Sequence, residues 1–142
     1  SLSRTNIRRV KHSKPGGTWR DWPKELVLDC HKDESGQSYD SVYGRMEADE
    51  PAPTITTQFY NLGSGRFGHY DTDQNRALSL REGALLQTFP NDYRFFENID
   101  NVGIRKTGVL IGNAVPPKLG EVVGERILEF VAGRRQYTLP EF

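Results

Sequence analysis

The sequence predicts a mixed α+β fold, because helix signals gather near its C-terminal end while strand signals lie earlier. The strand signals are short runs of β-branched residues between turns, and the helix signals are capped segments with apolar residues at helical spacing. With 142 residues, of which 35% are hydrophobic, the chain suits one domain with a modest core or a piece of something larger.

The first half is expected to contain one short helix and then strands joined by loops. Residues 3–12 predict the helix, with Ser3 as its cap and with Ile7 and Val10 three residues apart. The strand candidates are Leu26–Leu28, Val42–Tyr43 and a segment that starts near Thr54, and an exposed loop is expected over 31–41. The glycine-rich run 61–68 lacks the strand-to-helix spacing of a phosphate-binding loop, so no nucleotide site is expected there.

Two clearer helices are predicted in the second half. Ser79 and Glu82 form a Ser-x-x-Glu capping box, in which each side chain satisfies a free backbone N–H of the first turn. Pro90 is expected to stop that helix. The second helix should start at Pro116–Pro117 and end at Gly133. Its apolar residues recur at helical spacing: Leu119, Val122, Val123, Ile127, Phe130 and Val131.

Charge is unevenly distributed in a chain whose net charge is zero. Residues 1–24 hold seven basic residues: Arg4, Arg8, Arg9, Lys11, Lys14, Arg20 and Lys24. This stretch either tracks nucleic-acid phosphates or forms an ordinary solvated face. The sequence has no apolar run that could span a membrane, and no signal peptide is expected. The single cysteine, Cys30, rules out an intrachain disulfide and fits a reducing cytosol, so a cytoplasmic, nucleoid-associated location is expected.

One run carries a family resemblance: Arg76-Ala-Leu-Ser-Leu-Arg-Glu-Gly-Ala-Leu-Leu-Gln-Thr-Phe-Pro90. It resembles the ninth signature block of DNA cytosine-5 methyltransferases, which holds the target-recognition domain of those enzymes in place. The resemblance implies a structural role for Ser79, Arg81 and Glu82. A capped amphipathic helix of any origin would explain the capping box alone, but not the whole run.

A second run, Ile111-Gly-Asn-Ala-Val-Pro-Pro117, resembles the tenth block of the same family, which contributes to the S-adenosyl-L-methionine pocket. The resemblance implies that Asn113, Ala114 and Val115 contact this cofactor. A turn ahead of a helix also presents N–H groups and a carboxamide that suit a charged amino-acid moiety. The alternative is a plain turn before a helix that begins with proline.

A third set of segments resembles the end of the target-recognition region in bacterial members: Tyr43–Met46, Pro51–Thr57 and Gly65–His69. The resemblance implies that double-stranded DNA is the partner. It places Thr54 at the DNA backbone beside a flipped cytosine, whereas simple strand propensity is the alternative for this threonine. The other DNA-binding candidates are Arg45, Arg66 and Arg76, with Arg20, Trp19 and Trp22 as weaker ones. Ala48 and Tyr70 depart from the residues usual in relatives.

The catalytic part of the family pattern is not found in the chain. The reaction needs a cysteine thiolate that attacks C6 of cytosine before C5 takes the methyl group. The family nucleophile lies in a Pro-Cys pair, but Cys30 lies in Asp-Cys-His and is expected to be a partly buried structural residue. The glycine-rich cofactor loop and a Gln-x-Arg-x-Arg block are also missing. The three histidines have no ligand spacing, so no metal site is expected.

The resemblance therefore implies two regions. Residues 1–110 would form a small, strand-rich target-recognition domain, and residues 111–142 would supply a cofactor-pocket segment and a helix of the Rossmann-like catalytic domain. The function implied is S-adenosylmethionine-dependent methylation of C5 of cytosine in DNA, with the chain alone inactive. The missing catalytic half would belong to the same polypeptide or to a separate subunit. The exposed last helix is expected to promote self-association. A non-catalytic DNA-binding module and a plain interaction domain are the alternatives.

Overall fold

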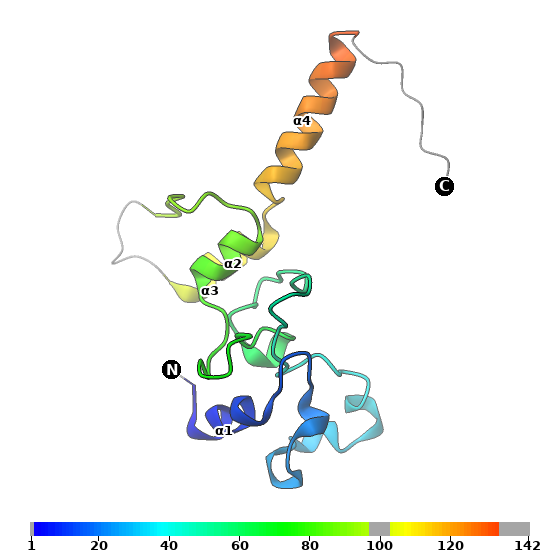
Figure 1. The fold of residues 1–142 in the computed structure, drawn as a ribbon, viewed down its shortest axis with the longest axis vertical. Helices are drawn as coiled ribbons and strands as arrows, with labels where there is room; N and C mark the ends of the chain where they lie inside the picture. Colours follow the sequence, from blue (N-terminus) through cyan, green and yellow to red (C-terminus); the bar gives the residue numbers. More distant parts are fainter. Residues whose placement is uncertain (1, 97–102, 134–142) are drawn as a thin grey trace.

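The computed structural model describes residues 2–96 and 103–133 (Figure 1). Within these residues the regular structure is helical. The α-helices are α1 (Arg4–His12), α2 (Leu80–Leu86), α3 (Ile104–Asn113) and α4 (Pro117–Val131). Short 3₁₀ turns lie between α1 and α2, at Trp19–Asp21, Lys24–Leu26, Asp29–His31, Glu34–Gly36 and Leu62–Ser64.

The helices that the sequence predicts with capping signals are present. Ser3 caps α1, because its hydroxyl accepts a hydrogen bond from the Asn6 N–H. The capping box of α2 is formed in both directions between Ser79 and Glu82. Helix α4 begins at Pro117, and Gly133 follows its end with a φ of 65°. These ends could be predicted because each depends on residues within one turn.

The prediction of a strand-rich domain is wrong. In the described part of the chain, strand pairing is limited to the isolated bridges Pro15↔Arg45, Arg45↔Gly68 and Gly68↔Ala77. Leu26 ends a 3₁₀ turn, Tyr43 has a positive φ of 59°, and the segment from Thr54 joins no ladder. A strand needs a partner over several residues as well as β propensity. Each candidate segment is instead taken up by turns: the segments near Leu26 and after Thr54 run into 3₁₀ or other turns, and Gly44 directly follows Val42–Tyr43.

Two apolar clusters hold these loops together. The larger cluster joins the loop region to α2 and α3, and its buried members are Met46, Ile55, Phe59, Phe67, Leu78, Ala84 and Ile111. The smaller cluster comprises Trp19, Trp22 and Leu26. The indole N–H of Trp22 donates to the Ser13 hydroxyl at 2.8 Å, so this cluster is attached to the end of α1.

Helix α3 is the element that sequence analysis does not predict. Its buried face carries Gly108 and Gly112, which are poor helix formers and read as breakers in sequence. A Cβ at Gly108 would overlap the Tyr60 ring, and one at Gly112 would overlap the backbone of Thr56. The glycines therefore allow α3 to approach the loop 56–60 closely, a requirement that only the tertiary structure reveals.

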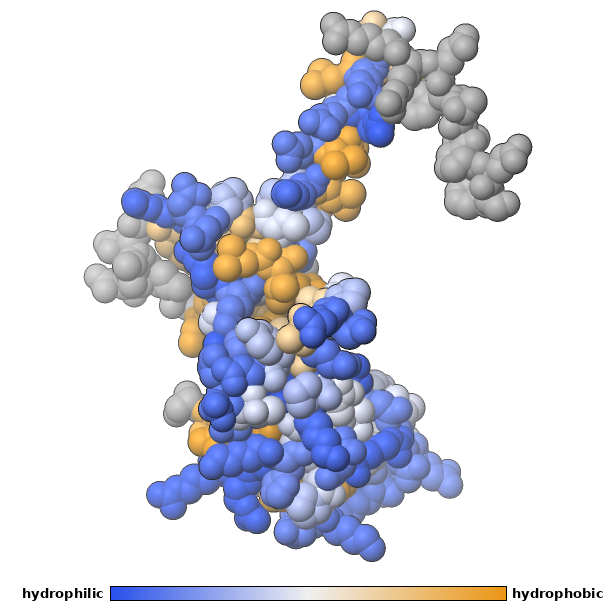
Figure 2. All heavy atoms as spheres, viewed as in Figure 1, coloured by the Kyte–Doolittle hydropathy of each residue, from blue (hydrophilic) through white to orange (hydrophobic). Residues whose placement is uncertain are grey.

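Helix α4 extends away from the rest of the molecule (Figure 1). None of its residues is buried. Figure 2 shows apolar side chains along one side of α4 and hydrophilic ones along the other. The exposed apolar residues include Leu119, Val122, Val123 and Ile127, each at least half exposed. These residues form an apolar stripe that no described residue covers.

Candidate functional site

Arg45, a DNA-binding candidate, lies in the interior with 1% of its surface exposed. Its guanidinium donates to the carbonyl oxygens of Val10, Ser13, His69, Asp71 and Gln74 and to the Asn75 side-chain oxygen, at 2.6–3.2 Å. Burial lowers the pKa of this guanidinium from its ordinary value. Because its donors are bound within the chain, Arg45 joins the end of α1 to the loop 69–75 and has none left for DNA.

Arg76, a second candidate, is also held within the chain. Its guanidinium forms a two-pronged ion pair with Glu82, with both N···O distances 2.7 Å, and it also donates to the Gln74 side chain. The hydrogen bond from Arg76 is the largest of the causes that lower the pKa of Glu82 to about 2. Arg76 therefore secures the carboxylate that caps α2.

His69 lies beside the ion pair of Arg76 and Glu82, and the sequence does not predict its role there. Its ring is buried, its Nδ1 accepts from the Asp71 N–H at 3.1 Å, and its Nε2 lies 3.4 Å from a Glu82 oxygen. Its position beside the capping box fixes the loop 69–76 against the start of α2. No local pattern around His69 signals this role, since Glu82 lies 13 residues away.

Thr54 and Arg66 present groups that the chain leaves unoccupied. Thr54 is exposed, and its hydroxyl has no hydrogen-bond partner among the described residues. Arg66 is half-buried: its Nε is buried without a partner, and its terminal guanidinium nitrogens make no hydrogen bond within the described residues. Arg66 and Pro53, the residue before Thr54, line one depression of about 300 Å³. Thr54 itself does not line this depression.

Arg20 lies on the surface beside the tryptophan cluster. It forms an exposed ion pair with Asp40 at 2.8 Å and lies over the Trp19 ring at 4.7 Å. Trp19 and Trp22 are themselves buried, and the Trp19 indole N–H donates to the Tyr39 carbonyl oxygen. Arg20 also donates to the Gln37 carbonyl oxygen at 2.6 Å, and an exposed ion pair such as the one with Asp40 contributes little to stability.

Helix α1 sorts the basic N-terminal stretch into two faces. Arg9 points inward, where it donates to the Leu26 carbonyl oxygen at 2.9 Å and lies over the Trp22 ring. Arg4, Arg8 and Lys11 are exposed and make no ion pair with the described residues. At about 3.6 residues per turn these three side chains share one face, opposite the face that holds buried Val10. We call Arg4, Arg8 and Lys11 the basic face of α1.

The candidate cofactor residues lie where α3 joins α4. Asn113 is the last residue of α3 and is exposed, Ala114 caps the helix, and Val115 is 68% exposed. The turn is thus Ala114–Pro116, whereas Gly112 and Asn113, where the sequence predicts a turn, belong to the last turn of α3. The Gln87 side chain donates to the Ile111 carbonyl oxygen at 3.2 Å. The two signature runs are therefore in direct contact.

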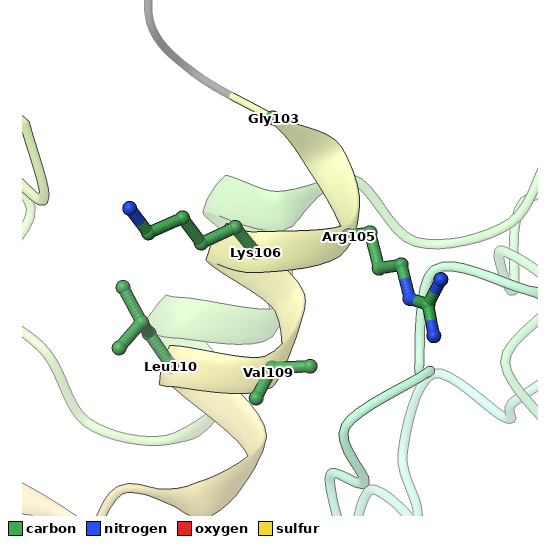
Figure 3. A pocket seen from close by; sticks show the side chains of 5 residues that line it. All are labelled: Gly103, Arg105, Lys106, Val109 and Leu110. Atoms are coloured by element: carbon green, nitrogen blue, oxygen red, sulfur yellow. The ribbon is translucent and has the colours of Figure 1, made fainter.

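The outer face of α3 carries a shallow depression of about 480 Å³ lined by Gly103, Arg105, Lys106, Val109 and Leu110 (Figure 3). Figure 3 shows that Lys106 and Leu110 extend to one side of the helix and Arg105 and Val109 to the other. This face is exposed, and it continues the partly apolar surface around the α3–α4 junction.

Cys30 is exposed, which corrects the expectation of a partly buried residue. It lies in the 3₁₀ turn Asp29–His31. Within the described residues no group of histidine, cysteine and acidic side chains has the arrangement of a metal site. No helix there has the length and hydropathy to cross a membrane.

Comparison with known proteins gives a consistent result. The model of the family C-5 cytosine-specific DNA methylase matches residues 2–129. Type II methylase M.HgiDII of Herpetosiphon aurantiacus is 55% identical over 93% of the chain, and type II methyltransferase M1.BsuMI of Bacillus subtilis is 45% identical over 80%. The chain spans 36% and 25% of the length of these two relatives. Type II methyltransferase M.AquIB of Picosynechococcus is 34% identical over 68% of the chain and 69% of its own length.

Proposed function

Because the chain belongs to the C-5 cytosine-specific DNA methylase family, we propose that it is the DNA-recognising part of an S-adenosylmethionine-dependent enzyme. That enzyme would transfer a methyl group to C5 of a flipped cytosine in duplex DNA. The observation that carries the proposal is the direct contact between the two signature runs, in the family order, through Gln87 and Ile111.

We assign DNA contact to the groups that the fold leaves unoccupied. Thr54 supplies a hydroxyl and Arg66 a guanidinium, and Arg20 is a surface cation held by an exposed ion pair, the Gln37 carbonyl oxygen and the Trp19 ring. The basic face of α1 adds three more cations. Arg45 and Arg76 leave this set, because their guanidinium groups are engaged inside the chain, where they hold the recognition loops in shape.

The cofactor contacts are assigned to the turn between α3 and α4. Asn113 presents an unoccupied carboxamide, which can bind the charged amino-acid end of S-adenosylmethionine, and Ala114 and Val115 provide adjoining backbone. The chain has a single cysteine, and it lies outside a Pro-Cys pair, so we assign no catalytic nucleophile to it. The thiolate and the remaining walls of the cofactor pocket would belong to the rest of the enzyme.

We propose the same division of the chain as the sequence predicts, with a helical recognition region in place of a strand-rich one. Residues 1–110 would face DNA, and residues 111–142 would join the catalytic domain. The apolar face of α4, formed by Leu119, Val122, Val123 and Ile127, supports this division because it has no cover within the described part of the chain. Without the catalytic domain the same face would promote self-association.

Two arrangements of the enzyme fit this proposal. In one, the chain is a segment of a single polypeptide, as the long relatives M.HgiDII and M1.BsuMI suggest. In the other, it is the smaller subunit of a split enzyme.

The proposal predicts a cofactor-specific defect when Asn113 is replaced by alanine. In the assembled enzyme, that is, this chain with the rest of the methyltransferase, Asn113→Ala should raise the KM for S-adenosylmethionine by about 10- to 100-fold, the range for one hydrogen bond to a charged group. Transfer of labelled methyl groups to cytosine in duplex DNA measures the effect.

The matched control is Asn91→Ala, which removes an exposed asparagine with no described hydrogen bond. It should leave the KM for S-adenosylmethionine and the KM for DNA unchanged. The chain alone should transfer no methyl groups. If the assembled protein binds duplex DNA but never methylates it, the chain is a non-catalytic DNA-binding module instead.

The basic face of α1 predicts a specific change in the salt dependence of DNA binding. In a triple variant, Arg4, Arg8 and Lys11 are each replaced by glutamine. The slope of log affinity against log salt concentration should then be reduced by about 3, roughly 0.9 for each phosphate that the variant no longer neutralises. Fluorescence anisotropy of the chain with duplex DNA at several salt concentrations measures the slope.

The control is Lys24→Gln, because Lys24 is an exposed basic residue outside α1. This substitution should change the slope by at most about 1. An unchanged slope in the triple variant would make this face an ordinary solvated one.

A further inference from the structure

Thr88 occupies a backbone conformation that its side chain disfavours. It directly follows the last turn of α2, with a φ of 64°. The N–H of Thr88 donates to the Leu85 carbonyl oxygen, and the N–H of Phe89 donates to that of Ala84. This is the Schellman arrangement of a helix end, in which the left-handed position is usually glycine. A β-branched residue is strained there, so some other interaction must offset that strain.

The Thr88 side chain makes such an interaction with another helix. Its hydroxyl accepts a hydrogen bond at 3.1 Å from the backbone N–H of Lys118, in the first turn of α4. The residue that precedes α4 is Pro116, which has no side chain able to cap the helix. Thr88 therefore caps α4 from a position 30 residues earlier in the chain.

The neighbouring residue binds the other side of the same turn. The Gln87 side-chain amide donates to the carbonyl oxygen of Ile111, in the last turn of α3, at 3.2 Å. The same oxygen also accepts a hydrogen bond at 3.2 Å from the N–H of Ala114, the residue that caps α3. Gln87 and Thr88 together thus bind the last turn of α3 and satisfy one free N–H at the start of α4. We call this pair the Gln87–Thr88 clasp.

The clasp fixes the segment between the two helices. Ala114, Val115 and Pro116 lie between Ile111 and Lys118, the two residues that it binds. All residues of α4 are at least partly exposed, so this hydrogen bond is a main attachment of the start of α4 to the recognition region.

We propose that Thr88 is a positioning residue for the cofactor, which orients the turn after Asn113 and couples it to α2 through the Gln87–Thr88 clasp. This inference rests on the proposed function, because it takes the turn to be part of the S-adenosylmethionine pocket. The strained φ of Thr88 is kept because glycine, which would relieve the strain, has no hydroxyl to cap α4.

Three variants in the assembled enzyme test the inference. Thr88→Gly relieves the strain and removes the hydroxyl, Thr88→Val removes the hydroxyl alone, and Thr88→Ser retains it. Thr88→Gly should keep or raise the Tm and yet raise the KM for S-adenosylmethionine by about fivefold, the loss expected for one hydrogen bond. Thr88→Val should raise the same KM with a lower Tm. Thr88→Ser should resemble the unaltered enzyme, and the KM for DNA should stay constant in all three.

Hydrogen exchange provides a second readout that does not depend on catalysis. The Lys118 amide should exchange faster in Thr88→Gly and Thr88→Val and at the original rate in Thr88→Ser. A Thr88→Gly enzyme with an unchanged KM for the cofactor, or with an unchanged Lys118 exchange rate, would overturn the inference. Asn113→Ala judges the proposed function separately, because it removes a cofactor contact and leaves the clasp intact.

Discussion

Replacing Arg45 by alanine is expected to lower the free energy of unfolding by about 4 kcal/mol, because it leaves the buried carbonyl oxygens of Ser13 and His69 without a donor and removes the hydrogen bonds to three further carbonyl oxygens. Five backbone carbonyl oxygens, from α1 to the loop 69–75, accept hydrogen bonds from this one guanidinium. Arg45→Lys should lose about half as much, since an ammonium has three donors and lacks the planar fork. Urea denaturation followed by circular dichroism measures both changes.

Arg66→Ala is the matched control for Arg45→Ala. Arg66 is a half-buried arginine whose Nε has no described partner, so its loss should cost less than about 1 kcal/mol of stability while DNA binding weakens. A stable Arg45→Ala chain with reduced DNA affinity as its only defect would contradict the structural role and restore Arg45 as a DNA contact.

The ion pair between Arg76 and Glu82 predicts that stability falls in acid. The pKa of Glu82 is depressed from 4.5 to about 2 in the folded chain. A group with a depressed folded pKa stabilises the fold fully above its unfolded pKa, and that contribution is lost as the pH falls toward the folded value. The contribution of Glu82 should therefore be complete near neutral pH and disappear between about pH 4.5 and 2.

Glu82→Gln should remove this contribution at neutral pH. Both partners are about a third exposed, so solvent screening reduces the expected loss to about 2 kcal/mol. The difference in unfolding free energy between the original chain and Glu82→Gln, measured by urea denaturation from pH 7 to pH 2.5, should shrink as the pH falls. Glu125→Gln, on the exposed surface of α4, should show no such difference. If the difference in unfolding free energy between the original chain and Glu82→Gln stays constant with pH, the carboxylate charge is not the stabilising feature.

Helix ends show where sequence reasoning succeeds. The Ser3 cap, the Ser79–Glu82 box and the proline start of α4 are all present, because a cap and the N–H group it satisfies lie within three or four residues. Helix α3 shows where it fails. Its glycines lower local helix propensity, and the benefit of their small size comes from Tyr60 and Thr56, about 50 residues away.

The arginines of the candidate site show the same contrast. The sequence alone determined the family, through two runs in the family order, and it supplied Thr54, Arg66 and Asn113 as candidates, whose polar groups the fold leaves unoccupied. Only the tertiary structure decided that Arg45 and Arg76 are engaged inside the chain, that the strand candidates form no ladder, and that Thr88 caps a helix 30 residues away. The reason is physical: the partners of a guanidinium, a strand or an uncapped helix are chosen by proximity in space, and local sequence carries no record of which distant segments become neighbours.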